Sequence, residues 1–392
     1  MVKIAFLLNS RVPSNDAHVL QSIRMCEAFA ANGHEVVLHY PDRMQTNPDL
    51  VDVDITSYYD VDAPFETRAY AYPDSNYLYT ALGRGTRTQS LLSRAFFTLY
   101  VTLRMRLTDA DVYYTRGCFL AALLVALGLP TVFETHRTAY GGVGERLVRW
   151  FADKPALRGV VTLTDETAAN LRGLGVPAER ILVAPDGVKL DAYDDPLSKA
   201  EARDRLGLPA DEYIVGYTGS LDRGKGVHDL VRATADLDVT VLVVGGRQER
   251  MRAAFRSYLD DHGIDNVELV GHVPPEDVPR YQWAADLLAL PARRDVQTES
   301  HHPESTSPLK LFEYMAAGRP IVATRLPGIE AVLTHDESGA LVEADDHVAL
   351  REAIEWVRAN PERAAYFAAH AARAVDSYRW TSRARRIVDD IT

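Results

Sequence analysis

Short β-branched runs alternate with longer helical patterns along this chain, and that alternation is the feature that most limits its fold. It is typical of parallel sheets that carry helices on both faces. In the first half the predicted strands are residues 4–8, 35–38, 112–114, 131–133, 160–163 and 181–183. In the second half they are residues 213–217, 240–244, 267–270, 287–290 and 321–323. Each half is therefore predicted to be an α/β, doubly wound, Rossmann-like sheet, while residues 51–79 give no clear pattern.

The chain has 392 residues, more than a single core usually contains, which favours two domains of similar size. Residues 186–209 include Asp191, Asp194, Asp195 and Pro196 and lack a strand pattern, so the boundary is expected there. The predicted domains are residues 1–190 and 191–377.

The composition narrows the functional classes. With 43 Lys and Arg against 55 Asp and Glu, the formal net charge is −12, which argues against sequence-independent nucleic-acid binding. Cys26 and Cys118 lie far apart in apolar segments, which argues against a disulfide framework and favours a reducing, cytoplasmic compartment. Residues 1–9 read as a buried strand rather than a cleavable signal. The longest uncharged run is interrupted by Gly128 and Pro130 and is too short to span a bilayer.

The residues from Ser307 onward are predicted to hold an anion at the start of a helix. Ser307 is a good N-cap, Pro308 fits the first helical position, and Gly318 ends the helix. The unpaired N–H groups and the dipole at that end favour phosphate, and Lys310 adds positive charge. Glu313, inside an apolar helix, requires a partner; sugar hydroxyls would serve, and so would an arginine.

A glycine-containing turn strengthens the phosphate hypothesis. The predicted strand 213–217 runs into Gly219, Ser220, Arg223 and Lys225. Glycine lets the backbone approach a ligand, while the two cations would neutralise a diphosphate. The spacing is not that of the dinucleotide fingerprint or the ATP-binding P-loop, and such turns also carry glycines for backbone reasons alone. Because ligands of open α/β sheets bind at the carboxyl ends of the strands, where both elements fall, a phosphate site is favoured.

Together these motifs resemble the retaining GT-B glycosyltransferases of family four, the glycogen-synthase-like or group 1 glycosyltransferases. The resemblance covers nearly the whole chain. In the second half its marks are residues 216–221 (GYTGSL) with Lys225 and Gly226, 271–273 (GHV) and 307–316 (SPLKLFEYMA). In the first half they are residues 111–117 (DVYYTRG), 133–136 (FETH) and 184–188 (APDGV).

The resemblance implies two Rossmann-like domains that face each other across a cleft, with residues 378–392 crossing back to the N-terminal domain and Trp380 as their anchor. It also implies transfer of a sugar from a UDP- or GDP-linked donor, held by the C-terminal domain, to an acceptor hydroxyl presented by the N-terminal domain. The anomeric configuration would be retained, and no metal or other cofactor would be needed. The acceptor would be a glycan, a lipid-linked molecule or a small molecule, in polysaccharide, glycolipid or glycoconjugate biosynthesis.

The resemblance also implies roles for individual residues. The glycine turn and the helix start would contact the diphosphate, and Glu313 would bind the ribose hydroxyls. The predicted donor-binding residues are Gly219, Ser220, Arg223, Lys225, His272, Ser307, Pro308, Leu309, Lys310 and Glu313. The predicted catalytic residues are His136, Lys225 and Glu304, with Lys225 substituting for a divalent ion and His136 supporting the transition state or orienting the acceptor. Residues predicted on the acceptor side are Asn9, Ser10, Arg11 and Arg116.

One departure from the family concerns the sugar contact. The first glutamate of the family's usual pair falls at Ser305 here, and Glu304 would take its role if the loop is shifted by one residue. His301 and His302 lie nearby, but adjacent histidines without a wider ligand spacing are more typical of a loop than of a metal site.

Several positions allow a second interpretation. Arg293 and Arg294 would pair with phosphate or face solvent. His136 would satisfy a backbone carbonyl if it had no function, although its alternation with Glu134 places both on one face of a strand end. The residues after the first strand would touch the acceptor or cap the following helix. Residues 84–106 form a basic amphipathic stretch that would rest on an anionic membrane or be a core helix with a solvated arginine face.

Two other functions are compatible with the motifs. A nucleotide-sugar epimerase of the same fold would bind the donor and need no acceptor. A degenerate, non-catalytic subunit, suggested by Ser305, would bind nucleotide without turnover.

Overall fold

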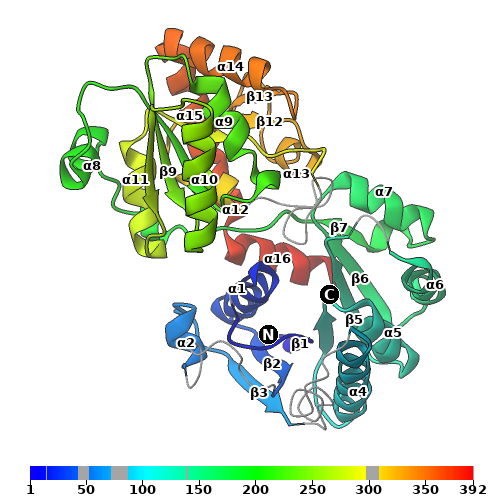
Figure 1. The fold of residues 1–392 in the computed structure, drawn as a ribbon. Coiled ribbons are helices and arrows are strands. Elements are labelled where there is room, and N and C mark those ends of the chain that lie inside the picture. Colours follow the sequence, from blue (N-terminus) through cyan, green and yellow to red (C-terminus); the bar gives the residue numbers. More distant parts are fainter. Residues whose placement is uncertain (15, 43–52, 72–86, 138–139, 297–308, 392) are drawn as a thin grey trace. The chain divides into compact units, whose positions relative to one another are not determined.

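The chain folds into two compact units, each built on a parallel sheet (Figure 1). The computed structural model describes residues 1–14, 16–42, 53–71, 87–137, 140–296 and 309–391. Unit 1 comprises Met1–Ala184 and Trp380–Thr392, and unit 2 comprises Pro185–Arg379. The sequence predicted the corresponding divisions after residues 190 and 377.

Unit 1 contains a seven-stranded sheet in the order β3-β2-β1-β4-β5-β6-β7, and the paired strands are parallel. Its strands are β1 Lys3–Leu7, β2 Glu35–Pro41, β3 Glu66–Tyr70, β4 Val112–Thr115, β5 Thr131–Thr135, β6 Leu157–Thr162 and β7 Ile181–Val183. The central strands are apolar and buried, as expected for a sheet covered on both faces.

Helices cover both faces of the unit 1 sheet (Figure 1). They are α1 Ala17–Ala31, α2 Ile55–Tyr58, α4 Arg87–Met105, α5 Cys118–Ala126, α6 Gly142–Phe151, α7 Asp165–Gly173 and α16 Trp380–Ile391, with a short 3₁₀ turn at Ala178–Arg180. Helices α4, α5 and α6 pack side by side on one face, and α1 and α16 lie on the other. Right-handed crossovers explain this division, because the chain moves one way along the sheet through α1 and the other way through the α4–α6 connections.

Unit 2 contains a six-stranded parallel sheet in the order β10-β9-β8-β11-β12-β13. Its strands are β8 Ile214–Gly219, β9 Thr240–Gly245, β10 Val267–Gly271, β11 Leu287–Leu290, β12 Ile321–Thr324 and β13 Ala340–Val342. Its helices are α8 Lys199–Leu206, α9 Val227–Thr234, α10 Glu249–Asp261, α11 Val278–Ala284, α12 Leu309–Ala316, α13 Pro327–Glu330, α14 His347–Ala359 and α15 Pro361–Ala374. Short 3₁₀ turns are Asp191–Tyr193, Arg223–Lys225 (η4), Pro275–Asp277 and Val375–Tyr378. One apolar cluster lies under α11 and α12 and another under α9 and α14, so both faces of the sheet are buried.

Each predicted strand overlaps an observed one, but the structure adds two strands that the sequence did not indicate. β3 lies in the segment without a clear pattern and forms the outer edge of the unit 1 sheet, where its side chains are mostly exposed. β13 has only three residues and forms one edge of the unit 2 sheet. Edge strands and very short strands carry little hydrophobic pattern, which is why both were missed.

The C-terminal helix α16 belongs to unit 1, as the resemblance implied. It packs against α1, and its buried residues include Trp380, Ala384, Ile387 and Val388. Asn32, which caps the end of α1, donates a hydrogen bond to the carbonyl of Thr381 at 2.9 Å. The helix therefore completes one layer of a unit whose other elements lie almost two hundred residues earlier.

Candidate active site

The turn after β8 presents Lys225 through backbone geometry that only glycine permits. Gly226 has φ +74°, and a Cβ at that position would lie 1.6 Å from the carbonyl oxygen of Pro291. The Asp222 side chain accepts a hydrogen bond from the Gly224 N–H at 3.0 Å and so caps η4, which contains Lys225. Lys225 is therefore placed at the carboxyl end of β8 by a fixed turn.

Helix α12 reaches the same end of β8. Lys310 Nζ donates to the Tyr217 hydroxyl at 3.2 Å and lies 4.4 Å from the centre of the Tyr217 ring. The Thr218 N–H donates to the Tyr314 hydroxyl at 2.8 Å, which ties the next turn of α12 to the strand. A Cβ on Gly219 would approach Lys310 Nζ to 2.5 Å, so glycine leaves the room that the ammonium occupies. The glycine turn and α12, predicted separately as phosphate elements, meet at one edge of the sheet.

Charge in this edge of unit 2 is poorly balanced. Burial, together with the charge of Lys225, lowers the pKa of Lys310 to about 7. Glu313 raises this pKa, but by less than the other two effects lower it. Burial also lowers the pKa of Lys225, although Asp222 opposes that shift. Burial raises the pKa of Glu313, and Lys310 and a hydrogen bond from Gln282 act in the other direction. Two partly desolvated lysines beside a carboxyl group that resists ionisation make a site that favours an anion.

Gln282 links Glu313 to the rest of unit 2, and sequence reasoning missed it. Its side chain is fully buried in α11, donates to Thr218 Oγ1 at 3.3 Å and accepts from the Tyr193 hydroxyl at 2.8 Å. A hydrogen bond from Gln282 to Glu313 orients the carboxyl group. No motif marks Gln282 or Tyr193, and only the folded arrangement brings them beside Glu313.

The other donor-side predictions fall in three places. Ser220, Arg223 and His272 are exposed residues at the carboxyl ends of β8 and β10. Leu309 is the first residue of α12. Glu304, Ser307 and Pro308 lie outside the described residues, as do Ser305, His301 and His302.

The hypothesis of a phosphate contact from Arg293 needs correction. Its guanidinium pairs with Asp229 at 3.0 Å, with Asp295 at 2.8 Å and with Asp345 at 3.3 Å. Arg294 contacts Glu343 at 3.8 Å. Arg293 is occupied by three carboxylates, so its charge stabilises the fold of this loop rather than a ligand.

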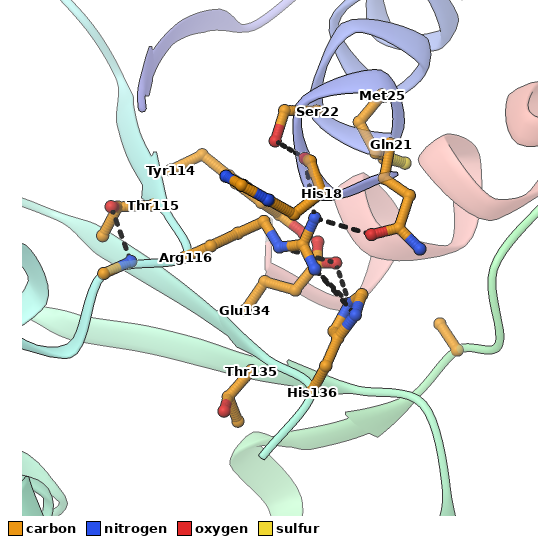
Figure 2. A network of polar contacts seen from close by, with 12 residues as sticks. His18, Gln21, Ser22, Met25, Tyr114, Thr115, Arg116, Glu134, Thr135 and His136 are labelled. Atoms are coloured by element: carbon orange, nitrogen blue, oxygen red, sulfur yellow. Dashed lines mark hydrogen bonds and ion pairs between the residues drawn. The ribbon is translucent and has the colours of Figure 1, made fainter. Parts of the chain in front are cut away.

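In unit 1, Arg116 and His136 meet at the carboxyl ends of β4 and β5 (Figure 2). Arg116 Nη1 donates to Gln21 Oε1 at 2.9 Å and to the carbonyl of His18 at 3.1 Å, both in α1. Its Nη2 lies 2.7 Å from His136 Nδ1 and 3.1 Å from Nε2. A group so nearly equidistant from both ring nitrogens lies against the ring rather than along one lone pair. Arg116 therefore packs on the imidazole and fixes it against α1.

Glu134 connects this pair to the interior. Only 1% of its surface is exposed, and its Oε1 lies 2.6 Å from His136 Nε2. Its other oxygen accepts from the Tyr114 hydroxyl, and the guanidinium of Arg383 in α16 contacts both oxygens. Burial raises the pKa of Glu134, but Arg383, the His136 hydrogen bond and Arg116 outweigh it, so the pKa lies well below its usual value. The carboxylate is ionised and can only accept, so His136 Nε2 carries a proton.

The remaining acceptor-side predictions surround the end of β1. Asn9 Nδ2 donates to Thr98 Oγ1 at 3.0 Å, and Ser10 Oγ lies 2.8 Å from His18 Nε2. Arg11 is half-buried in the same loop. The parallel strands β1, β4 and β5 bring this loop, Arg116 and His136 to one edge of the sheet. Contact of these residues with an acceptor stays a prediction.

Two Rossmann-like parallel-sheet units, the first completed by a returning C-terminal helix, define the GT-B class of fold. The chain belongs to the group 1, family 4 glycosyltransferases: the model described as "Glycosyl transferases group 1" matches residues 198–374, and that described as "Glycosyltransferase Family 4" matches residues 21–192.

Similar proteins agree with this class. A D-inositol 3-phosphate glycosyltransferase of Xylanimonas cellulosilytica is 31% identical over 59% of this chain and 55% of its own length. One from Corynebacterium urealyticum is 27% identical, again over 59% and 55%. The chain thus spans a little over half the length of these curated relatives.

Solved structures match over almost the whole fold. Anabaena Alr3699/HepE in complex with UDP is 17% identical, with a TM-score of 0.75 over 99% of this chain and 98% of that one. Sucrose-phosphate synthase from Thermosynechococcus elongatus is 21% identical, with a TM-score of 0.75 over 98% and 97%. At these identities the similarity defines the fold.

Proposed function

We propose that the protein transfers a sugar, as a hexosyltransferase-like enzyme, from a UDP- or GDP-linked donor to an acceptor hydroxyl, with retention and without a metal. The observation that carries the proposal is the convergence of Lys225 and Lys310 at the carboxyl end of β8. The relatives named as D-inositol 3-phosphate glycosyltransferases support it, as does a matching fold solved in complex with UDP-glucose.

In the proposed reaction, the bond between the anomeric carbon and the diphosphate oxygen breaks. The acceptor hydroxyl oxygen bonds to the same face of that carbon, and its proton passes to the departing diphosphate. Negative charge grows on the diphosphate as it leaves, so Lys225 and Lys310 would lower the barrier by stabilising it. Gly219, Ser220, Arg223 and the start of α12 would add contacts, and Glu313 would accept hydrogen bonds from the ribose. His136, backed by Arg116, would face the acceptor.

A donor screen tests the proposal. The protein is mixed with UDP- and GDP-sugars, and nucleotide release is measured with and without EDTA. Lys225→Ala is expected to lower turnover about 10²- to 10³-fold, as for loss of one preorganised donor to a developing anion. Lys199→Ala is the control, because Lys199 pairs with Asp286 at the amino-terminal edge of the same sheet. Anomeric coupling constants of the product report retention.

The outcomes separate the three functions. Release that requires an acceptor supports the transferase. A changed sugar without an acceptor indicates an epimerase, and nucleotide binding without turnover indicates a non-catalytic subunit. If no donor is bound and no nucleotide is released, all three functions are contradicted.

We also propose that unit 1 contacts an anionic membrane through α4. Phe96, Leu99 and Leu103 recur at helical spacing on α4, and Leu107 lies in the turn that follows the helix. These four side chains are between 51% and 84% exposed, while the opposite side of the helix is buried. Arg104 is exposed beside them. An exposed apolar stripe flanked by arginine favours an interface between headgroups and acyl chains. Among the residues that the structure describes, no helix is both long and apolar enough to span a bilayer.

Flotation with vesicles of phosphatidylcholine and phosphatidylglycerol tests this contact. Wild-type protein is expected in the floating fraction and Leu103→Glu outside it. Val348→Glu is a matched control, because Val348 in α14 and Leu103 have the same exposed fraction of 53%. Wild-type protein that stays at the bottom of the gradient removes the membrane proposal.

A further inference from the structure

Helix α16 contributes a buried cation, Arg383, which contacts Glu134. Its Nη2 lies 3.2 Å from Glu134 Oε1 and its Nη1 lies 3.4 Å from Oε2, so each arm of the guanidinium faces one carboxylate oxygen. The same group donates to the carbonyl of Ala184 at 3.2 Å and lies 2.9 Å from the sulfur of Met25. Only 3% of Arg383 and 1% of Glu134 is exposed.

Glu134 in turn accepts from His136, which lies at the end of β5. Three groups compete for the two carboxylate oxygens: the Tyr114 hydroxyl, the imidazole and the Arg383 guanidinium. A carboxylate held by a two-armed guanidinium has a fixed plane, because both oxygens are tethered at once. The direction from which His136 Nε2 can donate is then fixed as well.

We propose that Arg383 is a positioning residue, whose guanidinium holds the Glu134 carboxylate so that His136 keeps one ring orientation at the acceptor-side edge of unit 1. The role in turnover rests on the proposed glycosyl transfer; the role in orienting the ring does not. Arg383 itself touches no substrate, since it lies behind Glu134.

Packing alone gives no reason for an arginine here. Ala384, Ile387, Val388 and Trp380 already bury an apolar side of α16. A buried ion pair adds little stability compared with apolar residues of similar size, because both charges lose their hydration. The buried charge of Arg383 is better explained by its role in orienting the Glu134 carboxylate and, through that carboxylate, the His136 imidazole.

The first measurement is the ring signal of His136 by ¹⁵N-histidine NMR, assigned from the spectrum of His136→Asn. In the wild type we expect a downfield, slowly exchanging Nε2–H proton, because its acceptor is a buried carboxylate. Arg383→Gln is expected to abolish or broaden that signal. Arg385→Gln is the matched control, because Arg385 is an exposed arginine on the same helix, and it should leave the signal unchanged.

The second measurement is steady-state kinetics with the donor found in the screen. Arg383→Gln is expected to lower kcat about tenfold and leave KM for the donor unchanged, since the donor-side residues belong to unit 2. A residue that only stabilised the fold would lower the amount of active protein and leave the ring signal of the folded fraction intact.

Arg383→Lys covers the case in which the glutamine variant does not fold. A lysine is a point charge and cannot tether both oxygens, so the ring signal should shift and kcat should fall several-fold. An unchanged ring signal in the folded Arg383 variants overturns the proposal. Loss of the signal in a protein that shows no transferase activity supports the positioning role and contradicts only the proposed function.

Discussion

The polar clusters at the carboxyl edges of the two sheets solve the problem of buried charge in opposite ways. In unit 1, Glu134 is surrounded by Arg383, Arg116, His136 and Tyr114, and its pKa is held well below the usual value. In unit 2, burial lowers the pKa of both Lys225 and Lys310, the charge of Lys225 lowers that of Lys310 further, and the nearby Glu313 has a raised pKa. The first cluster is satisfied internally and is suited to hold an imidazole still. The second has excess positive charge and is suited to bind an anion.

The largest difference between the two clusters is expected when Glu134 or Glu313 is replaced by alanine. Glu134→Ala leaves the buried guanidinium of Arg383 without its carboxylate partner, so the free energy of unfolding should fall by about 3–5 kcal/mol. Glu313→Ala removes a carboxyl group that resists ionisation, together with its hydrogen bond from Gln282, so the cost should be about 1 kcal/mol. Urea denaturation of both variants measures the difference. Equal losses would show that the two clusters are not different in kind.

Glycine substitutions probe how each turn is held. Gly226→Ala forces a left-handed φ on alanine and places its Cβ against the Pro291 carbonyl, so we expect a loss of about 2 kcal/mol or more. Gly117→Ala, beside Arg116, has φ −92° and meets only the Leu120 side chain at 3.3 Å, so its cost should stay below about 1 kcal/mol. Thermal unfolding gives both values. A larger effect at Gly117 would mean that the unit 1 turn is the more constrained one.

The pH dependence of nucleotide binding sharpens the comparison further. Lys310 has a pKa of about 7, and a bound diphosphate favours its charged form, so binding should take up a proton above pH 7. Affinity for UDP should therefore fall as pH rises from 7.5 to 9, by about tenfold per pH unit as long as the pH lies between the pKa of free and of UDP-bound Lys310. Calorimetry in two buffers of different ionisation enthalpy measures the proton uptake.

Lys310→Arg is the control for that measurement, because arginine stays charged throughout this range. Its affinity should be nearly independent of pH. Proton release on binding to the wild-type protein would contradict the assignment of Lys310 to the diphosphate.

Local pattern was enough to predict the central strands, the helix that carries Lys310 and the glycine turn that carries Lys225. It was not enough for β3, an exposed edge strand, or for β13, which has three residues. The phosphate motifs could be found because each is contiguous. The contact of Glu134 with Arg383 could not, since the two are separated by 249 residues and no periodicity connects them. Gln282 was missed for the same reason.

The position of α16 has a consequence for biosynthesis. Residues 185–379, which form all of unit 2, separate α16 from the rest of unit 1 in the sequence. A ribosome must therefore synthesise the whole second unit before the first can bury the surface of α1 that α16 covers. Until then the nascent first unit exposes that surface and lacks Arg383, the buried cation beside Glu134, so the unit that is made first is the one that finishes folding last.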